Sequence, residues 1–277
     1  MIGFFLSQNL LKATYFHEHK IDSSVSMNKE SSTAYENFLK FIAEEEGVVY
    51  ADQHKVIIKN LYKDFLVGLK SQKKPIFVAI GGSPGAGKTT YRKSLDLTQQ
   101  HIHNVDEVMS RLPEYKEDLL VIGAKAAFAK WVVFSRRMSQ LLLRFAMKSA
   151  FNVIYDRPCG REENVEDFLF AKKHGYYVRL VGFYIPLEIA RQRVLIREFQ
   201  EGRGVPDNIL VDDHARFSAI WKYLLPLVDE ASLYSSSQRI LTLIFSSKQG
   251  VVDEKLYQEF LQGGELFVDH FAKILKS

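Results

Sequence analysis

Residues 81–90, GGSPGAGKTT, hold the residue types that bind the phosphates of a nucleotide. Gly82, Gly87, Lys88 and Thr89 fill every fixed position of the pattern G-x-x-x-x-G-K-[ST]. Glycine permits backbone angles that a Cβ forbids, so such a loop can turn its N–H groups toward phosphate oxygens. In this pattern the lysine reaches the β- and γ-phosphates and the threonine hydroxyl binds Mg²⁺. We therefore predict an ATP and Mg²⁺ site that consists of Gly82, Ser83, Pro84, Gly85, Ala86, Gly87, Lys88, Thr89 and Thr90.

The segments on either side of this loop fit the same interpretation. Residues 76–80, IFVAI, form a short apolar run with β-branched members, which predicts a buried strand. Residues 89–95 can continue from the loop as a helix, whose first turn offers unpaired N–H groups to an anion. A strand, a glycine loop and a helix in this order are the context that the motif requires.

Farther along the chain, apolar runs alternate with helical spacings. We predict strands at 101–105, 152–156, 177–185 and 239–245, and helices at 118–150, 163–173, 187–201, 208–232 and 253–275. This alternation predicts the α/β class, with a parallel sheet flanked by helices.

The N-terminal part of the chain has a different pattern. Tyr35, Phe38, Phe41 and Ile42 share the spacing of one helix face, which predicts helices that pack against the core. We predict a helical N-terminal extension over residues 1–70, whose first thirty residues or so we expect to be poorly ordered, followed by one large domain over 71–277.

Composition excludes several classes of protein. The chain has 277 residues and a formal net charge of +4, from 37 basic and 33 acidic side chains. This mild charge argues against a dedicated nucleic-acid binder, and no apolar stretch is long enough to span a membrane. Cys159 is the one cysteine, so no intrachain disulfide can form, and we expect a reducing compartment, the cytoplasm. The apolar start, MIGFFLSQNLL, lacks a basic segment, and we do not expect a signal peptide.

The loop occurs in many nucleotide-binding proteins, and the remaining sequence narrows the choice. Motor and AAA-type ATPases need a strand that ends in Asp-Glu, but Arg157 follows Asp156 at the end of its predicted strand. The guanine-reading segment N-K-x-D of GTPases is absent from the sequence. The acids and arginines that remain have the spacing found in small-molecule kinases.

Four stretches carry a more specific resemblance. They are GGSPGAGKTT, NVDEVMSRLPEY at 104–115, RRMSQLLLRFAMKSAFNVIYD at 136–156 and VLIREFQEGRGVP at 194–206. In order and spacing they resemble the zeta toxin family, P-loop kinases that phosphorylate UDP-N-acetylglucosamine on its sugar. The resemblance covers residues 76–215 and implies a P-loop kinase fold with a lid near 197–206.

The resemblance also implies roles for four charged residues. Asp106 matches the family's catalytic base, which takes the proton of the attacking hydroxyl. Its alternative role is that of an N-cap for the helix that follows. Arg197 and Arg203 match the two lid arginines, whose planar guanidinium groups can each contact two phosphate oxygens. With Lys88, these residues form the implied catalytic set.

Among the residues that match the family's substrate-binding residues, one differs from the family in type. Asp156 matches an acid that contacts the sugar, and Arg161 matches an arginine in the next loop, for which Arg157 is a rival. The family's substrate glutamate falls at Gln140, which keeps a hydrogen-bond acceptor but loses the charge. We therefore predict that UDP-N-acetylglucosamine is a poor acceptor here and that Gln140→Glu improves its use.

Two further alternatives stay open. The acceptor could be another nucleotide, a dinucleotide or a nucleic-acid end. In the second alternative, the chain binds nucleotide without turnover and serves as an interaction module. The resemblance also implies a protein antitoxin or inhibitor as partner, and residues 245–250, after the last predicted strand, are a candidate seat for adenine.

Overall fold

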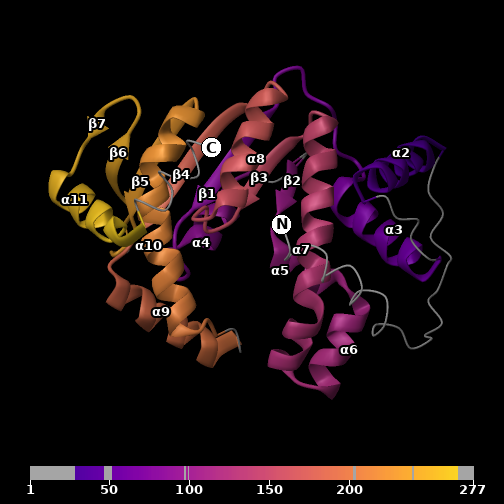
Figure 1. Ribbon diagram of the computed structural model, residues 1–277, viewed down its shortest axis with the longest axis horizontal. Coiled ribbons are helices and arrows are strands. Elements are labelled where there is room, and N and C mark those ends of the chain that lie inside the picture. The colour runs from indigo at the N-terminus through magenta and orange to yellow at the C-terminus, as the bar shows by residue number, and fades with distance from the viewer. Residues whose placement is uncertain are drawn as a thin grey trace.

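The chain is built around one mostly parallel sheet. The computed structural model describes residues 29–46, 52–96, 98, 100–201, 204–238 and 240–267. Seven strands lie in the order β2-β3-β1-β4-β5-β6-β7 (Figure 1). They are β1 (Ile76–Gly81), β2 (Gln100–His103), β3 (Asn152–Asp156), β4 (Tyr177–Tyr184), β5 (Glu230–Ser235), β6 (Thr242–Ser246) and β7 (Gly250–Val251). β1 to β5 pair in parallel and β6 and β7 are antiparallel, so the predicted fold class is confirmed.

Helices connect the strands and flank the sheet. They are α2 (Lys29–Glu46), α3 (Asp52–Leu66), α4 (Lys88–Lys93), α5 (Val105–Arg111), α6 (Pro113–Val121), α7 (Ala124–Lys148), α8 (Glu162–Lys173), α9 (Leu187–Glu201), α10 (Asp207–Leu224) and α11 (Glu254–Gln262), with 3₁₀ turns η1 (Leu225–Leu227) and η2 (Glu265–Phe267). The helical stretch predicted at 118–150 consists of α6 and α7. The predicted helix at 253–275 ends at Gln262, and residues 268–277 lie outside the described part of the chain. None of the described helices is both long and apolar enough to cross a bilayer.

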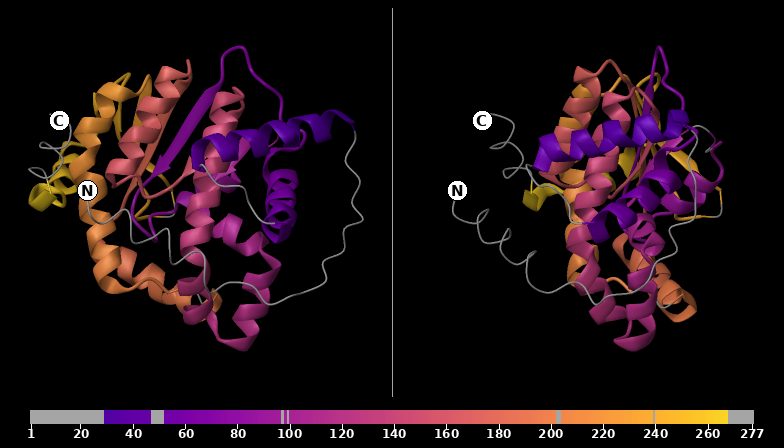
Figure 2. Two further views of the ribbon diagram at one scale, coloured as in Figure 1. Left: turned by 45° about the vertical axis from the view of Figure 1, so that its right-hand side comes forward. Right: turned by 90° about the vertical axis from the view of Figure 1, so that its right-hand side faces the viewer.

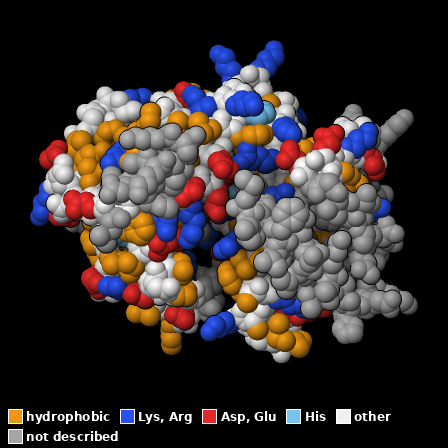
Figure 3. All heavy atoms as spheres, viewed as in Figure 1, with side chains coloured by type: hydrophobic (Ala, Val, Ile, Leu, Met, Phe, Trp, Pro, Cys, Tyr) orange, Lys and Arg blue, Asp and Glu red, His pale blue; other side chains and the backbone are white. Residues whose placement is uncertain are grey.

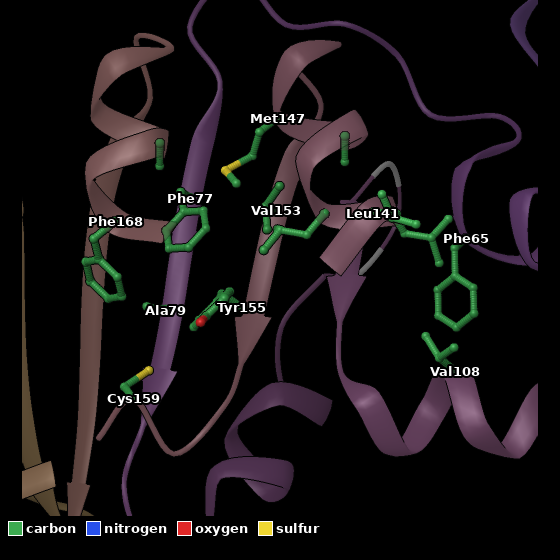
Figure 4. Packing of buried hydrophobic residues seen from close by; sticks show 14 of the residues in the cluster. Phe65, Phe77, Ala79, Val108, Leu141, Met147, Val153, Tyr155, Cys159 and Phe168 are labelled. Carbon is green, nitrogen blue, oxygen red and sulfur yellow. The ribbon is translucent and has the colours of Figure 1, made fainter. Parts of the chain in front are cut away.

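Side chains alternate between the two faces of the sheet, as the period of a strand requires. Phe77 and Ala79 of β1 and Tyr155 of β3 belong to the larger core cluster, which also includes Phe168 of α8 (Figure 4). Ile80 and Ile154 point to the opposite face, into a smaller cluster that contains residues of α9. Because both faces are covered, the central strands are apolar throughout rather than alternating with polar residues.

The N-terminal helices pack where their apolar spacing predicts. Tyr35, Phe38, Phe41 and Ile42 are all buried, and they belong to the same core cluster as the main sheet. Phe38 lies 5.0 Å from the ring of Phe145 on α7, measured between centroids. Figure 2 shows α2 lying across α7. The expectation for residues 1–30 falls almost entirely outside the described residues.

One predicted helix was wrong at its C-terminal end. The stretch 208–232 was expected to be helical, but α10 ends at Leu224 and residues 230–235 form β5. Pro226 cannot continue an α-helix because it lacks an N–H group, and the chain passes through η1 at that point. Leu233 and Ala231 then pair with Gly182 and Leu180 of β4, a long-range contact that local spacing could not reveal.

The hairpin of β6 and β7 shows that the prediction of adenine binding by residues 245–250 was wrong. β6 runs antiparallel to β5, and Ser246 pairs with Ser232 near the amino end of β5. Residues 245–250 therefore lie at the edge of the sheet opposite the carboxyl ends of the parallel strands. Open α/β sheets bind ligands at those carboxyl ends, so a base bound beside the glycine loop cannot reach this hairpin.

Packing of α2 predicts a large stability effect for one buried ring. Phe38 is fully buried, and Phe38→Ala should lower the free energy of unfolding by roughly 3–5 kcal/mol, the usual cost of such a cavity. The matched control is Phe199→Ala, because Phe199 is 95% exposed and its loss should change stability by less than about 0.5 kcal/mol. Urea unfolding of both variants gives the comparison. Equal stabilities would show that α2 contributes nothing to the folded core.

Candidate active site

The glycine loop joins β1 to α4 through backbone angles that only glycine tolerates. Gly82 has φ +133°, and a Cβ there would lie 2.5 Å from the carbonyl oxygen of Phe183 on β4. Gly85 has φ +81°, and its Cβ would meet the carbonyl oxygen of Ala190 at 3.0 Å. The loop is therefore pressed against β4 and α9, which fixes its shape before any ligand binds.

Two side chains far along the sequence hold the outer side of the loop. Arg193 of α9 donates to the carbonyl of Gly85 at 3.2 Å and to that of Ser236 at 2.6 Å. The Ser236 hydroxyl donates to the carbonyl of Ala86 at 2.8 Å. These contacts occupy carbonyl groups of the loop. Neither residue is marked by a local pattern, because Arg193 lies 108 residues from its partner in the loop.

Lys88 lies at the centre of a group of charges. Its Nζ donates to the carbonyls of Gly82 at 2.6 Å and Ser83 at 2.9 Å. Burial lowers the pKa of Lys88, whereas the charges of Asp156 and Asp213 raise it and that of Arg197 lowers it. Arg197 therefore lies close enough to Lys88 for its charge to be felt there. Arg203 is outside the described residues.

Asp156 ends β3 directly beside the loop strand. It pairs in register with Ile80 of β1, and its carboxylate is buried. Arg92 of α4 places its Nε 3.3 Å from this carboxylate, and Asn104 donates to it at 3.1 Å. Arg92 also forms an ion pair with Glu107 of α5. These contacts connect the loop helix α4, the strand β3 and the helix α5.

Asp106 is the second residue of α5, and it is not the helix cap. The N-cap is Asn104, whose side-chain oxygen accepts from the backbone N–H groups of Asp106 at 2.9 Å and Glu107 at 3.2 Å. The alternative role of Asp106 as an N-cap was therefore wrong. The Asp106 side chain is exposed, and among the described residues no side chain or backbone group holds its carboxylate.

Gln140 belongs to a polar network between α7 and α8. Its Nε2 donates to the buried Asp167 at 2.7 Å, and Arg144 pairs with the same oxygen at 2.8 Å. The Tyr155 hydroxyl donates to the other oxygen of Asp167 at 2.8 Å. A glutamate at position 140 would face this carboxylate, so the structure argues against the expected benefit of Gln140→Glu.

The two candidate arginines after β3 differ in their partners. Arg161 lies 3.3 Å from Asp213 and 3.8 Å from Asp212 of α10, so carboxylates already balance its charge. Arg157 lies 3.5 Å from the Nε2 of His103, and no described carboxylate is within ion-pair distance of it.

The remaining loop residues differ in their exposure. Thr89 and Thr90 are exposed on the first turn of α4, whereas Ser83 and Ala86 are buried. Figure 3 shows Lys, Arg, Asp and Glu side chains gathered around a hollow between the parts of the chain that carry α10 and α7. In Figure 1, α9 lies on one side beyond the carboxyl ends of the strands, and α5 and α6 lie on the other.

The braced glycine loop on a parallel sheet defines a phosphate-binding protein with a P-loop kinase fold. The profile of the Zeta toxin family matches residues 60–225, and the chain belongs to this family of P-loop, kinase-like toxins. No curated protein matches the sequence.

Two solved structures show the same fold. One comes from the PezAT chromosomal toxin–antitoxin system of Streptococcus pneumoniae, with a TM-score of 0.56 and 22% identity over 81% of this chain and 98% of that one. The other is AvrRxo1-ORF1:-ORF2 with ATP, with a TM-score of 0.55 and 16% identity over 87% of this chain and 79% of that one. At these identities the likeness concerns the fold alone.

Strand β2, beside the site, contains two buried histidines. Because of them we expect the free energy of unfolding to fall in acid. Burial lowers the pKa of His101 to about 4 and that of His103 well below its usual value. Between about pH 6.5 and pH 4 the unfolded chain therefore binds more protons than the folded chain, and each histidine costs roughly 1.4 kcal/mol per pH unit as the pH falls.

The histidine contribution can be isolated by comparing slopes. The raised pKa values of the buried Asp167 and Asp213 act in the opposite direction, so the native chain alone gives a mixed result. Urea unfolding between about pH 7 and pH 4.5 should show a shallower loss of stability in His101→Leu than in the native chain. Parallel curves for the two proteins would contradict burial of a neutral His101.

Proposed function

We propose that this chain is an ATP- and Mg²⁺-dependent kinase that transfers the γ-phosphate to a hydroxyl group of a small molecule. The observation that carries the proposal is the exposed, unengaged carboxylate of Asp106 on the same edge of the sheet as the braced loop. Membership of a kinase-like family supports phosphoryl transfer as the reaction class.

On the nucleotide side, the loop supplies positioning and charge. Backbone N–H groups of Gly85 and of residues 87–90 would hold the phosphate oxygens, and Lys88 would leave its two carbonyl partners to contact the β- and γ-phosphates. Mg²⁺ prefers oxygen ligands and keeps several waters, so the exposed Thr89 hydroxyl together with phosphate oxygens fits its demands. When bound, the ion neutralises charge on the transferring group.

On the acceptor side, Asp106 would take the hydroxyl proton as the new bond forms. The acceptor oxygen attaches to the γ-phosphorus, the bond to the bridging oxygen breaks, and ADP leaves with that electron pair. Arg197 and Arg203 would stabilise the charge that spreads over the transferring group, which is where fixed cationic donors contribute most. Asp156, Gln140 and Arg161 are proposed to shape the acceptor site.

The acceptor itself is proposed to be a nucleotide-like molecule. UDP-N-acetylglucosamine should be a poor acceptor, because Gln140 carries no charge and its amide is engaged by Asp167. We expect kcat/KM with this sugar nucleotide below about 10⁴ M⁻¹s⁻¹, the low end for efficient enzymes. A higher value in a coupled ADP-release assay would restore the sugar nucleotide as substrate.

A protein partner is part of the proposal. The Streptococcus pneumoniae relative belongs to a toxin–antitoxin system, and the AvrRxo1 structure pairs two open reading frames. We include a protein antitoxin among the partners proposed for this chain.

Two substitutions separate binding from chemistry. Lys88→Ala should weaken ATP binding and abolish transfer, because the phosphates lose a point charge. Asp106→Asn keeps the shape of the side chain but cannot take a proton, so ATP affinity should survive while kcat falls by about 10²-fold or more. Calorimetric ATP titration and ADP release measure the two quantities. Near-native kcat in Asp106→Asn would remove the base from the mechanism.

A further inference from the structure

Four side chains form a closed ring of contacts around the first turn of α5. Glu107 of α5 forms an ion pair with Arg92 of α4. Arg92 places its Nε 3.3 Å from Oδ2 of Asp156, and Asn104 donates to the same oxygen at 3.1 Å. Asn104 is the N-cap of α5, so the ring returns to the helix from which it started. In the sequence, Asp106 lies between the two points at which the ring meets α5.

The ion pair of Arg92 and Glu107 is the part of this ring that joins two helices. The Arg92 side chain is 11% exposed and that of Glu107 is 31% exposed, so water screens their attraction only in part. In the described part of the chain, the Nε–H group of Arg92 has no aligned hydrogen-bond acceptor, so its contact with Asp156 is one of charge. Arg92 therefore holds two carboxylates from different elements at once, for which a planar guanidinium is better suited than the point charge of lysine.

The first turn of α5 depends on such polar contacts. The helix has seven residues, and isolated helices shorter than about 12–15 residues are marginal in water. Its buried residues, Val108 and Met109, follow the first turn. The first turn, which carries Asp106, is held by the cap of Asn104 and by the ion pair of Glu107.

At its other end, the ion pair is attached to the nucleotide loop. Arg92 lies four residues after Lys88, about one helical turn, on the helix that begins at the loop. One side chain thus connects the helix of the loop to the turn that carries Asp106. Phosphoryl transfer depends on the relative position of the two reacting groups, and a displacement of about 1 Å can slow an enzyme on the order of 10²-fold.

We propose that Arg92 and Glu107 are positioning residues, which set the position of the Asp106 carboxylate relative to the glycine loop. The inference rests on the proposed function and adds to it two residues that act through Asp106. Loss of the pair should slow transfer without weakening ATP binding, because Arg193 and Ser236 brace the loop separately.

The test variant is Glu107→Gln, which keeps the size of the side chain and removes its charge. It would be made in the native chain and in Asp106→Asn. The matched control is Glu230→Gln, because Glu230 also lies beside an arginine, Arg179, but near the amino ends of β4 and β5. Each protein would be incubated with Mg²⁺, varied ATP and a fixed amount of a protein-free metabolite extract. Mass spectrometry gives the rate of product formation, and calorimetry gives the affinity for ATP.

The expected result is a loss of rate that depends on Asp106. In the native background, Glu107→Gln should lower the apparent kcat by about tenfold or more, with the KM and Kd for ATP unchanged. In the Asp106→Asn background it should change the rate by less than about twofold, because the group through which it acts is already lost. Glu230→Gln should match the native chain.

Three results would overturn the inference. The first is a native kcat in Glu107→Gln. The second is a loss of ATP affinity as large as the loss of rate, which would assign the pair to the loop. The third is an equal loss of rate in both backgrounds, which would show that the pair acts independently of Asp106. All three leave the proposed function intact, whereas a native chain that phosphorylates nothing in the extract would contradict the proposed function and this inference together.

Discussion

The close approach of Gly82 to the backbone of Phe183 is the constraint on which the site depends. With 2.5 Å between a would-be Cβ and a carbonyl oxygen, any other residue would push the loop away from β4. That position fixes the loop against α9, whose Arg193 donates to the carbonyl of Gly85, while Ser236 after β5 donates to that of Ala86. The phosphate cradle is therefore a product of long-range packing between β1, β4 and α9, and it is more than a local glycine turn.

From this loop the rest of the site is connected by charge. Arg92 extends from α4 to Asp156 on β3 and to Glu107 on α5, and Asn104 links the cap of α5 to the same aspartate. A shift of α5 would therefore disturb the loop helix as well. This coupling gives Asp106 a fixed position relative to the glycine loop, and in the described part of the chain its exposed carboxylate is held by no other group.

Much of this arrangement could be predicted from the sequence, and the failures have physical causes. The loop, the strand that ends in Asp156 and the helices α8 and α9 follow from local spacing and turn chemistry. β5 was missed because its short apolar run follows a helix and is decided by pairing with β4. The contacts of Arg193 with the loop and of Gln140 with Asp167 join elements distant in sequence, which local spacing does not reveal. The cap role of Asn104 is local, because its side chain accepts from residues two and three positions along the chain. Arg203 lies outside the described residues, so its role stays a prediction.

The central claim is that the braced loop serves phosphoryl transfer to a small molecule. Its most direct test is mass spectrometry of a metabolite extract incubated with the purified chain, ATP and Mg²⁺. With the native chain, the account predicts that at least one metabolite gains the mass of a single phosphoryl group and is otherwise unmodified. With Lys88→Ala, it predicts that no metabolite in the extract is phosphorylated. An extract in which no metabolite is phosphorylated, although the chain binds ATP, would contradict the account and favour a nucleotide-binding module without turnover.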